Sequence, residues 1–313
     1  MKRRAFRAAE AGALAEVVVR GLGCSPDEAR VLIGRGAVYL RGRRQRDPAL
    51  GVAAGAEVLV VLEEGGRSST APPPVPPPLR VLHEDDQVLA LDKPAGLPAQ
   101  PTPGGVTSLL LLASAHLGRE AGLVHRLDRD TTGVMVFGKT PEATSALAGS
   151  FRSGAARKQY LAVTAPGLPV EGTCTLRLAR DRSRPGRWVA RPRDGLEAET
   201  RFRRLATTAE LSLAALWPRT GRTHQIRAHL AVLGAPIAGD RLYGGPLRLR
   251  GEAIGRSLLH AHLLLLPHPR TGAPLRLEAT LPADMAPWFA ALEVVPPGEA
   301  PELTAAGSAA PRR

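Results

Sequence analysis

One short segment holds an unusual density of charged side chains. Residues 122–133 read GLVHRLDRDTTG and place His125, Arg126, Asp128 and Asp130 between apolar flanks. If the flanks bury a carboxylate, it is costly unless a cation or several hydrogen-bond donors satisfy it. The segment could therefore supply a charged carboxylate with a cationic partner. Charge alone leaves open whether it is only a solvated loop, and which aspartate would react.

A second segment, residues 219–230, reads RTGRTHQIRAHL. Thr223 is predicted to cap a helix that runs to about Leu233, which would put Arg222 and Arg227 near its N-terminus, against the helix dipole. Such cations are tolerated where they bind an anion, either a phosphate or a paired aspartate. A solvated helix start is the alternative. His224 and His229 are five residues apart and share no helix face, so no metal site is expected.

The bulk composition points to a polyanionic partner. The chain has 313 residues and a formal net charge of +13, which indicates nucleic acid, although a genome-wide excess of arginine is the alternative. A hydrophobic share of 44% argues against wholesale disorder. The two cysteines, Cys24 and Cys174, exclude a disulfide framework. Apolar runs such as 109–115 are far shorter than the ~20 residues of a membrane span, so we expect a cytoplasmic protein.

Proline-rich sequence divides the chain. Residues 63–78, which include RSSTAPPPVPPP, are predicted to form a semi-rigid linker. It would separate an N-terminal domain, residues 12–62, from a larger domain, residues 79–292. Residues 293–313, rich in proline and small side chains, are predicted to be a disordered tail.

The N-terminal domain is predicted to be a small α/β unit. Ser25 caps a helix with Pro26 at its first position and Glu28 at its third, and strands follow at 37–40 and 57–61. With the turn YLRGR at 39–43 and the sequence AGAE at 54–57, this pattern resembles the S4 RNA-binding domain. A small appendix with a solvated basic face is the alternative. The arginines expected to contact RNA are Arg35, Arg41, Arg43 and Arg44.

The larger domain alternates strands and helices without regular crossover helices. Strands are expected at 81–86, 88–91, 133–137, 158–164, 199–206, 210–216, 259–266 and 275–279. Helices are expected at 107–117, at 141–151 with Thr140 as its cap, and at 223–233. This order predicts an α+β fold with a mixed, mostly antiparallel sheet flanked by helices.

Five motifs in the larger domain resemble those of the RluA family of RNA pseudouridine synthases. They are HRLD followed by TTG at 125–133, GRTHQIR at 221–227 with PI, GD and YG at 236–244, KQY at 158–160, KPAGL at 93–97 and LHA at 259–261. Thr132 stands where the family has serine and Asp92 where it has asparagine. The resemblance implies the pseudouridine synthase fold, and an S4 domain before the catalytic domain is common in this family.

The resemblance also implies roles for individual residues. Asp128 would engage a flipped uridine, Tyr160 would stack on the uracil, and Arg227 would pair with Asp128 and keep it charged. Arg126 would fill the space left in the RNA stack, and His125 and Arg222 would contact RNA. Whether Asp128 attacks the ribose, attacks the base or removes a proton stays open. We read Asp130 as structural or exposed, and Asp240 as shaping a loop.

The expected function is isomerisation of uridine to pseudouridine in structured RNA, with large-subunit ribosomal RNA as the first candidate. The reaction needs no cofactor and no metal, and the protein is expected to be a monomer that does not bind membranes. The alternatives are a synthase directed to transfer RNA and a non-catalytic protein that binds RNA or assists ribosome assembly.

Overall fold

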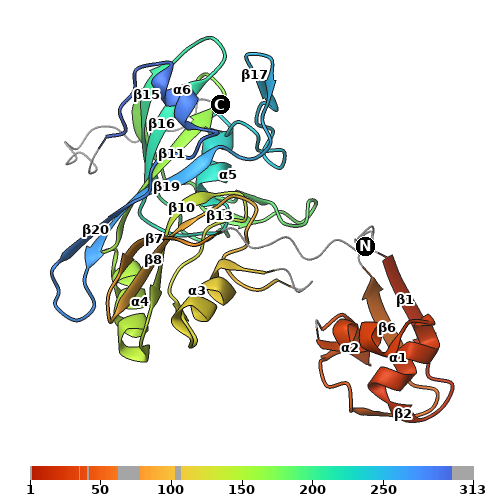
Figure 1. Ribbon diagram of the computed structural model, residues 1–313. Coiled ribbons are helices and arrows are strands. Elements are labelled where there is room, and N and C mark those ends of the chain that lie inside the picture. Colours follow the sequence, from red (N-terminus) through yellow and green to blue (C-terminus); the bar gives the residue numbers. More distant parts are fainter. Residues whose placement is uncertain (1, 35, 41, 63–77, 103–106, 298–313) are drawn as a thin grey trace. The chain divides into compact units, whose positions relative to one another are not determined.

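The computed structural model describes residues 2–34, 36–40, 42–62, 78–102 and 107–297, without the side chains of residues 2, 3, 43, 44 and 62. The chain divides into two compact units, one N-terminal and one that holds most of the chain from Pro77 onward (Figure 1). Apart from residue 78, the predicted linker lies outside the described residues. Each unit is therefore described by itself.

The N-terminal unit is a four-stranded sheet with two helices. Its strands follow the order β1-β6-β3-β4, and α1 and α2 pack on it around Leu14, Val18 and Ile33. The helix cap at Ser25 is confirmed, because the Ser25 hydroxyl accepts from the Glu28 N–H and the Glu28 carboxylate accepts from the Ser25 N–H. The elements are β1 (Lys2–Arg7), β2 (Gly12–Ala13), α1 (Leu14–Leu22), α2 (Pro26–Gly34), β3 (Val38–Leu40), β4 (Arg43–Gln45), β5 (Gly51–Val52) and β6 (Glu57–Leu62).

The predicted start of this unit at residue 12 is wrong. β1 lies before it and pairs antiparallel with β6 from Lys2↔Leu62 to Arg7↔Glu57, so it belongs to the same sheet. The S4 assignment stays a prediction.

The larger unit is built on a ten-stranded mixed sheet, with β19 near its middle (Figure 1). Its main path is β12-β15-β16-β11-β19-β10-β8-β7, and the pairing of β10 with β19 is parallel among antiparallel neighbours. The predicted α+β class is therefore confirmed. The strands of this sheet are β7 (Arg80–Glu84), β8 (Val88–Lys93), β9 (Gly122–Leu123), β10 (Thr132–Gly138), β11 (Arg157–Thr164), β12 (Glu171–Cys174), β15 (Thr200–Thr207), β16 (Ser212–Pro218), β19 (Leu259–Pro267) and β20 (Pro274–Glu278).

Helices and small hairpins cover this sheet. The helices are α3 (Leu109–Leu117), α4 (Pro141–Ser153), α5 (Gln225–Val232) and α6 (Ala286–Ala290), and the hairpin strands are β13 (Leu178–Arg180), β14 (Trp188–Ala190), β17 (Arg248–Leu249) and β18 (Glu252–Ala253). Thr140 caps α4 as predicted, since its hydroxyl accepts from the Ala143 N–H. None of the helices in the described ranges has the length and apolar character needed to cross a bilayer.

The central strands of the sheet are buried on both faces, which explains why β8 is apolar at positions 88–91 and β10 at positions 134–137. On β8, Leu89 and Leu91 pack with α3, while Val88 and Ala90 pack with Leu147 of α4. Successive side chains of a strand point to opposite faces, so α3 and α4 cover opposite sides of this half of the sheet. The other half is arranged in the same way, with α5 and α6 on opposite faces of β11 and β16.

The C-terminal boundary also differs from the prediction. Residues 293–297, assigned to a disordered tail, are part of the folded unit. Val294 packs against the cluster of Trp288 and Phe289, and the Gln159 Nε2 donates to the Pro297 carbonyl at 3.0 Å. Residues 298–313 lie outside the described residues.

Candidate active site

Asp128 lies in the loop that leads into β10, and backbone contacts hold this loop in place. The Lys93 Nζ donates to the Arg129 carbonyl at 2.8 Å, and the Arg256 Nη1 donates to the Asp130 carbonyl at 3.0 Å. The Thr131 N–H donates to the Asp128 carbonyl at 3.1 Å. The two residues that follow Asp128 are therefore held through their main-chain carbonyls.

Lys93, from the KPAGL motif, is the main support of this loop. It is fully buried, and its Nζ donates to three carbonyls, those of Pro94, Leu97 and Arg129, at 2.7–2.9 Å. Three acceptors match the three N–H donors of an ammonium group, although burial lowers the pKa of Lys93 to about 7. The residue joins the turn at 94–97 to the Asp128 loop.

The LHA motif supports the other end of the loop. The His260 Nδ1 lies 2.9 Å from the Thr132 hydroxyl, and its Nε2 lies 3.2 Å from the Ala279 carbonyl. The carbonyl can only accept, so Nε2 carries the proton and Nδ1 accepts from Thr132. This contact gives a physical reason why threonine can replace serine at position 132, since either residue supplies the hydroxyl.

Arg227 lies in the first turn of α5 and connects two carboxylates. Its Nη1 donates to the Asp128 Oδ2 at 3.1 Å, while its Nε and Nη2 donate to the two oxygens of Asp240 at 2.6 and 2.9 Å. The predicted pairing with Asp128 is thus present, but the bidentate partner is Asp240. Burial lowers the pKa of Arg227, but the hydrogen bonds and charges of Asp240 and Asp128 raise it well above its usual range.

The start of α5 differs from the prediction. The N-cap is His224 and not Thr223, and His224 has a left-handed backbone with φ 55° and makes no capping bond through its side chain. The preceding loop is held instead by buried Gln225, whose Oε1 accepts from the Thr220 hydroxyl and the Arg222 N–H. This arrangement turns His224 toward Asp128, with 3.8 Å between Nε2 and Oδ2.

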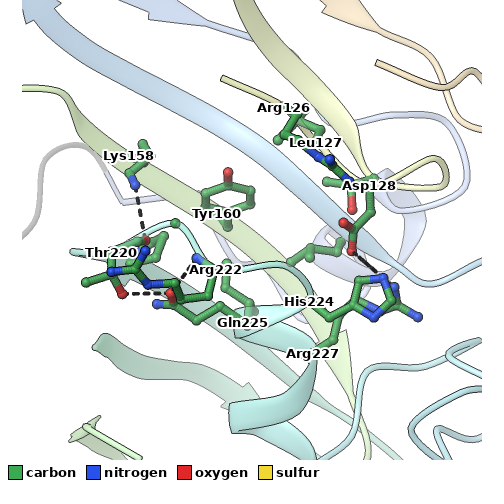
Figure 2. Close-up of a pocket in the computed structure, with 15 residues that line it drawn as sticks. Arg126, Leu127, Asp128, Lys158, Tyr160, Thr220, Arg222, His224, Gln225 and Arg227 are labelled. Carbon is green, nitrogen blue, oxygen red and sulfur yellow. Dashed lines mark hydrogen bonds and ion pairs between the residues drawn. The ribbon is translucent and has the colours of Figure 1, made fainter. Parts of the chain in front are cut away.

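Tyr160 lies on β11 directly after an irregularity in the pairing with β19, between Gln159 and Tyr160. Such bulges re-aim a side chain, often beside an active site. The Tyr160 ring borders the pocket and is partly buried (Figure 2). Burial, and then the nearby charge of Asp128, raise the pKa of Tyr160, so the phenol stays neutral.

These groups border one open pocket with about 470 Å³ of empty space (Figure 2). Asp128, Tyr160, Arg227, Arg126 and Arg222 all line it, so segments 30 to 100 residues apart meet here as the motifs predict. Lys158 also lines the pocket and donates to the Thr220 carbonyl at 3.3 Å. Burial lowers the pKa of Lys158 to about 8.

His125 does not have the position of an RNA contact. Its Nε2 accepts from the Val136 N–H at 3.0 Å, and its ring stacks on Phe151 with centroids 4.5 Å apart. Burial, and then the charge of Lys158, lower the pKa of His125 to about 3, so the ring is neutral. We therefore assign His125 to support of the loop instead.

The other residues predicted to contact RNA divide into two groups. Arg126 and Arg222 are exposed at the pocket, and the Arg222 Nε donates to the Glu197 carbonyl at 2.9 Å. Arg35 and Arg41 lie outside the described residues, as do the side chains of Arg43 and Arg44, whose backbone forms β4.

Sequence reasoning missed three residues that hold the site: Lys93, Asp240 and Arg256. Asp130, by contrast, has an exposed side chain, and the structure uses its carbonyl. Lys93 and Asp240 lie within the motifs KPAGL and GD, but these motifs do not show which atoms the two side chains hold. Nothing in the local sequence marks Arg256.

Comparison with known proteins identifies the family. A family model described as RNA pseudouridylate synthase matches residues 87–232. The ribosomal large subunit pseudouridine synthase D of Xanthomonas campestris pv. campestris is 40% identical over 238 residues, which cover 68% of this chain and 69% of that protein. The chain belongs to the RNA pseudouridine synthases. The protein of the same name from Xylella fastidiosa is 38% identical over 286 residues, 83% of this chain and 82% of that one.

The fold agrees with the family. The solved structure of human RNA pseudouridylate synthase domain containing 4 superposes with a TM-score of 0.57 and 28% identity, covering 70% of this chain and 95% of that one. The family and the fold class expected from the motifs are therefore confirmed. As an RNA pseudouridine synthase, the protein is an isomerase that converts uridine to pseudouridine.

Proposed function

We propose that this pseudouridine synthase modifies large-subunit ribosomal RNA and that Asp128 is its catalytic carboxylate. The observation that carries the residue assignment is the position of Asp128. It is 23% exposed, is held by Arg227, and borders the pocket beside Tyr160. The names of the two bacterial relatives and the net charge of +13 support a large ribosomal substrate.

The reaction moves uracil on its own ribose. The bond between N1 and C1′ breaks, the base turns, a bond forms between C5 and C1′, and C5 loses its proton while N1 gains one. The uridine must first leave its stack, at a cost of a few kcal/mol. The neutral Tyr160 ring offers a face on which the flipped base can stack, and Arg227 keeps the Asp128 carboxylate charged and oriented.

Arginines outside the pocket would position the RNA. Arg126 would occupy the space that the flipped uridine leaves, and Arg222 would contact the backbone at the rim. The S4-like unit would add Arg35, Arg41, Arg43 and Arg44, and phosphate contacts of this kind make binding strongly dependent on salt. In this proposal the protein acts as a monomer in the cytoplasm, without a cofactor or metal.

The target can be tested by deleting the gene and mapping pseudouridines in ribosomal and transfer RNA by carbodiimide-based sequencing. We expect at least one pseudouridine to disappear from large-subunit ribosomal RNA and to return when the wild-type gene is restored. Loss confined to transfer RNA would replace the ribosomal target by the transfer RNA alternative. If no RNA loses a pseudouridine, the proposal of a cellular RNA target fails.

A further inference from the structure

His224 lines the pocket and has an unusual backbone conformation. It has no part in the functions assigned above. Its backbone is left-handed, with φ 55°, in a residue that is not glycine. Such conformations are uncommon for residues with a side chain and cluster at functional sites. The side chain is 17% exposed, and its Nε2 lies 3.8 Å from the Asp128 Oδ2.

The other ring nitrogen of His224 has a partner that favours one tautomer. The Nδ1 lies 3.2 Å from the Tyr243 hydroxyl. That hydroxyl oxygen already accepts from the Trp188 N–H at 2.9 Å, so its own proton is free to be donated to Nδ1. A neutral ring that accepts at Nδ1 must carry its proton on Nε2, the atom that faces Asp128.

Burial keeps the His224 ring neutral. The charged groups that face it are Asp128, Arg227, Asp240 and Arg126. Burial lowers the pKa of His224, and its effect is larger than that of any of these charges. Burial also raises the pKa of Tyr243 to about 12, so the hydroxyl keeps its proton. The Arg227 guanidinium lies 5.1 Å from the centre of the Tyr243 ring, so one tyrosine contacts both groups that approach Asp128.

We propose that His224 is a positioning residue that directs its Nε2–H at the Asp128 Oδ2. The Trp188 N–H donates to the Tyr243 hydroxyl, and this hydroxyl in turn donates to the His224 Nδ1, so the ring is held in place. Arg227 donates to the same oxygen. Two donors on Oδ2 leave Oδ1 as the oxygen that meets the uridine, and they hold the carboxylate plane while the base is detached and turned. Closure of the 3.8 Å gap to a hydrogen bond would accompany RNA binding.

The test uses the full-length protein and total RNA from cells that lack the gene, grown with uridine tritiated at C5. This probe contains the target whichever RNA it is, so the test is independent of the ribosomal proposal. Tritium release reports loss of the C5 proton. Rates are measured with enzyme in excess over a range of concentrations, which separates the maximal rate from half-saturation.

Three variants distinguish the side-chain donor from the backbone. Asparagine tolerates the left-handed conformation, so His224→Asn keeps the turn but is too short to reach Asp128. His224→Gln can place an N–H near the position of Nε2. Tyr243→Phe keeps the ring beside Arg227 and removes only the hydroxyl.

We expect His224→Asn to lower the maximal rate about 10- to 100-fold with little change in half-saturation, as for a misplaced catalytic group. His224→Gln should recover most of the rate. Tyr243→Phe should be slower than the wild type, and the double variant His224→Asn/Tyr243→Phe no slower than His224→Asn alone, because the hydroxyl acts through His224.

Three results would overturn the proposal. His224→Asn could react as fast as the wild type, or His224→Gln could be as slow as His224→Asn. In the third case, the effects of His224→Asn and Tyr243→Phe would multiply in the double variant. Circular dichroism of each variant confirms that the comparison is made on folded protein.

Discussion

The buried carboxylate of Asp240 should be essential to the site although it is not expected to touch the RNA. It is fully buried, accepts two bonds from Arg227, and also accepts from the N–H groups of Leu242 and Tyr243 at 3.1 and 3.3 Å. Asp240→Asn keeps the shape but replaces one acceptor oxygen by an NH₂ group. In place of Oδ2 that group would face the Arg227 Nε, and in place of Oδ1 it would face the Arg227 Nη2 and both backbone N–H groups, so donors oppose each other in either orientation.

The cost can be estimated from the burial of the pair. Removing one charge of a buried ion pair costs about 3–5 kcal/mol. Arg227 keeps its bond to Asp128, so we expect Asp240→Asn to lower the free energy of unfolding by about 3 kcal/mol, the lower end of that range. Because the orientation of Arg227 is lost, we also expect the rate of pseudouridine formation to fall about 100-fold.

Asp86→Asn is the matched control. Asp86 pairs with Arg270 through both carboxylate oxygens, as Asp240 does with Arg227, but its side chain is 55% exposed and that of Arg270 is 60% exposed. Exposed pairs contribute about 1 kcal/mol or less, so this variant should lose little stability and keep its activity.

Unfolding in urea can be followed by tryptophan fluorescence. All three tryptophans, at positions 188, 217 and 288, lie in the larger unit, so the signal reports the unit that carries the site. Tritium release gives the rate. The reasoning would be refuted if Asp240→Asn were as stable as Asp86→Asn and reacted within a few-fold of the wild type.

Three further variants test separate parts of the structure. Lys93→Met leaves three carbonyls without their donor, so it should lower the free energy of unfolding by at least about 3 kcal/mol in the urea assay; a loss below about 1 kcal/mol would contradict the role of Lys93. Burial lowers the pKa of His125 to about 3, below its unfolded value of 6.5, so only the unfolded chain takes up this proton between those values. Stability contributed by the neutral ring is therefore lost as the pH falls. Between pH 6 and 4, the free energy of unfolding of the His125→Gln variant should fall by about 1.4 kcal/mol less per pH unit than that of the wild type. Equal pH dependence of the two proteins in urea titrations would refute this. Deleting residues 1–78 should raise the Kd for ribosomal RNA and flatten its salt dependence in filter binding while the larger unit stays folded; an unchanged Kd at raised salt would remove the functional content of the S4 prediction.

The sequence was most informative where local chemistry decides the structure. Thr140 and Ser25 begin helices because their hydroxyls satisfy free N–H groups a few residues away, and such signals need no tertiary information. The uninterrupted apolar runs of β8 and β10 likewise indicate strands buried on both faces. The order of strands and helices without regular crossover helices, together with the motifs, predicted the fold class.

The sequence was less informative where distant contacts decide. β1 reads KRRAFR and has no strand pattern of its own; it is a strand because it pairs with β6, some fifty residues away. Thr223 is of a residue type that often caps helices. The buried Gln225 side chain instead holds this segment by donating to the Glu199 carbonyl and the Thr200 hydroxyl, and the N-cap is His224. Propensity cannot anticipate such a replacement.

The same distinction holds within the site. The motifs predicted that Asp128, Tyr160 and Arg227 would share a pocket, and they do. They did not predict that Arg227 would be held by Asp240, because the pairing depends on the path of the chain between α5 and residue 240. The role of Asp240 could be inferred only once both ends of the guanidinium were seen to be occupied.

The most direct test of the account compares Asp128→Asn with Asp130→Asn in purified full-length protein. Both substitutions remove one negative charge from the same loop, but Asp128 borders the pocket and bonds to Arg227, whereas the Asp130 side chain is exposed. Tritium release from C5-labelled RNA of cells lacking the gene is measured with enzyme in excess. We predict no release by Asp128→Asn and near wild-type release by Asp130→Asn; release by Asp128→Asn at a rate close to that of the wild type would contradict the assignment of Asp128 as the catalytic carboxylate.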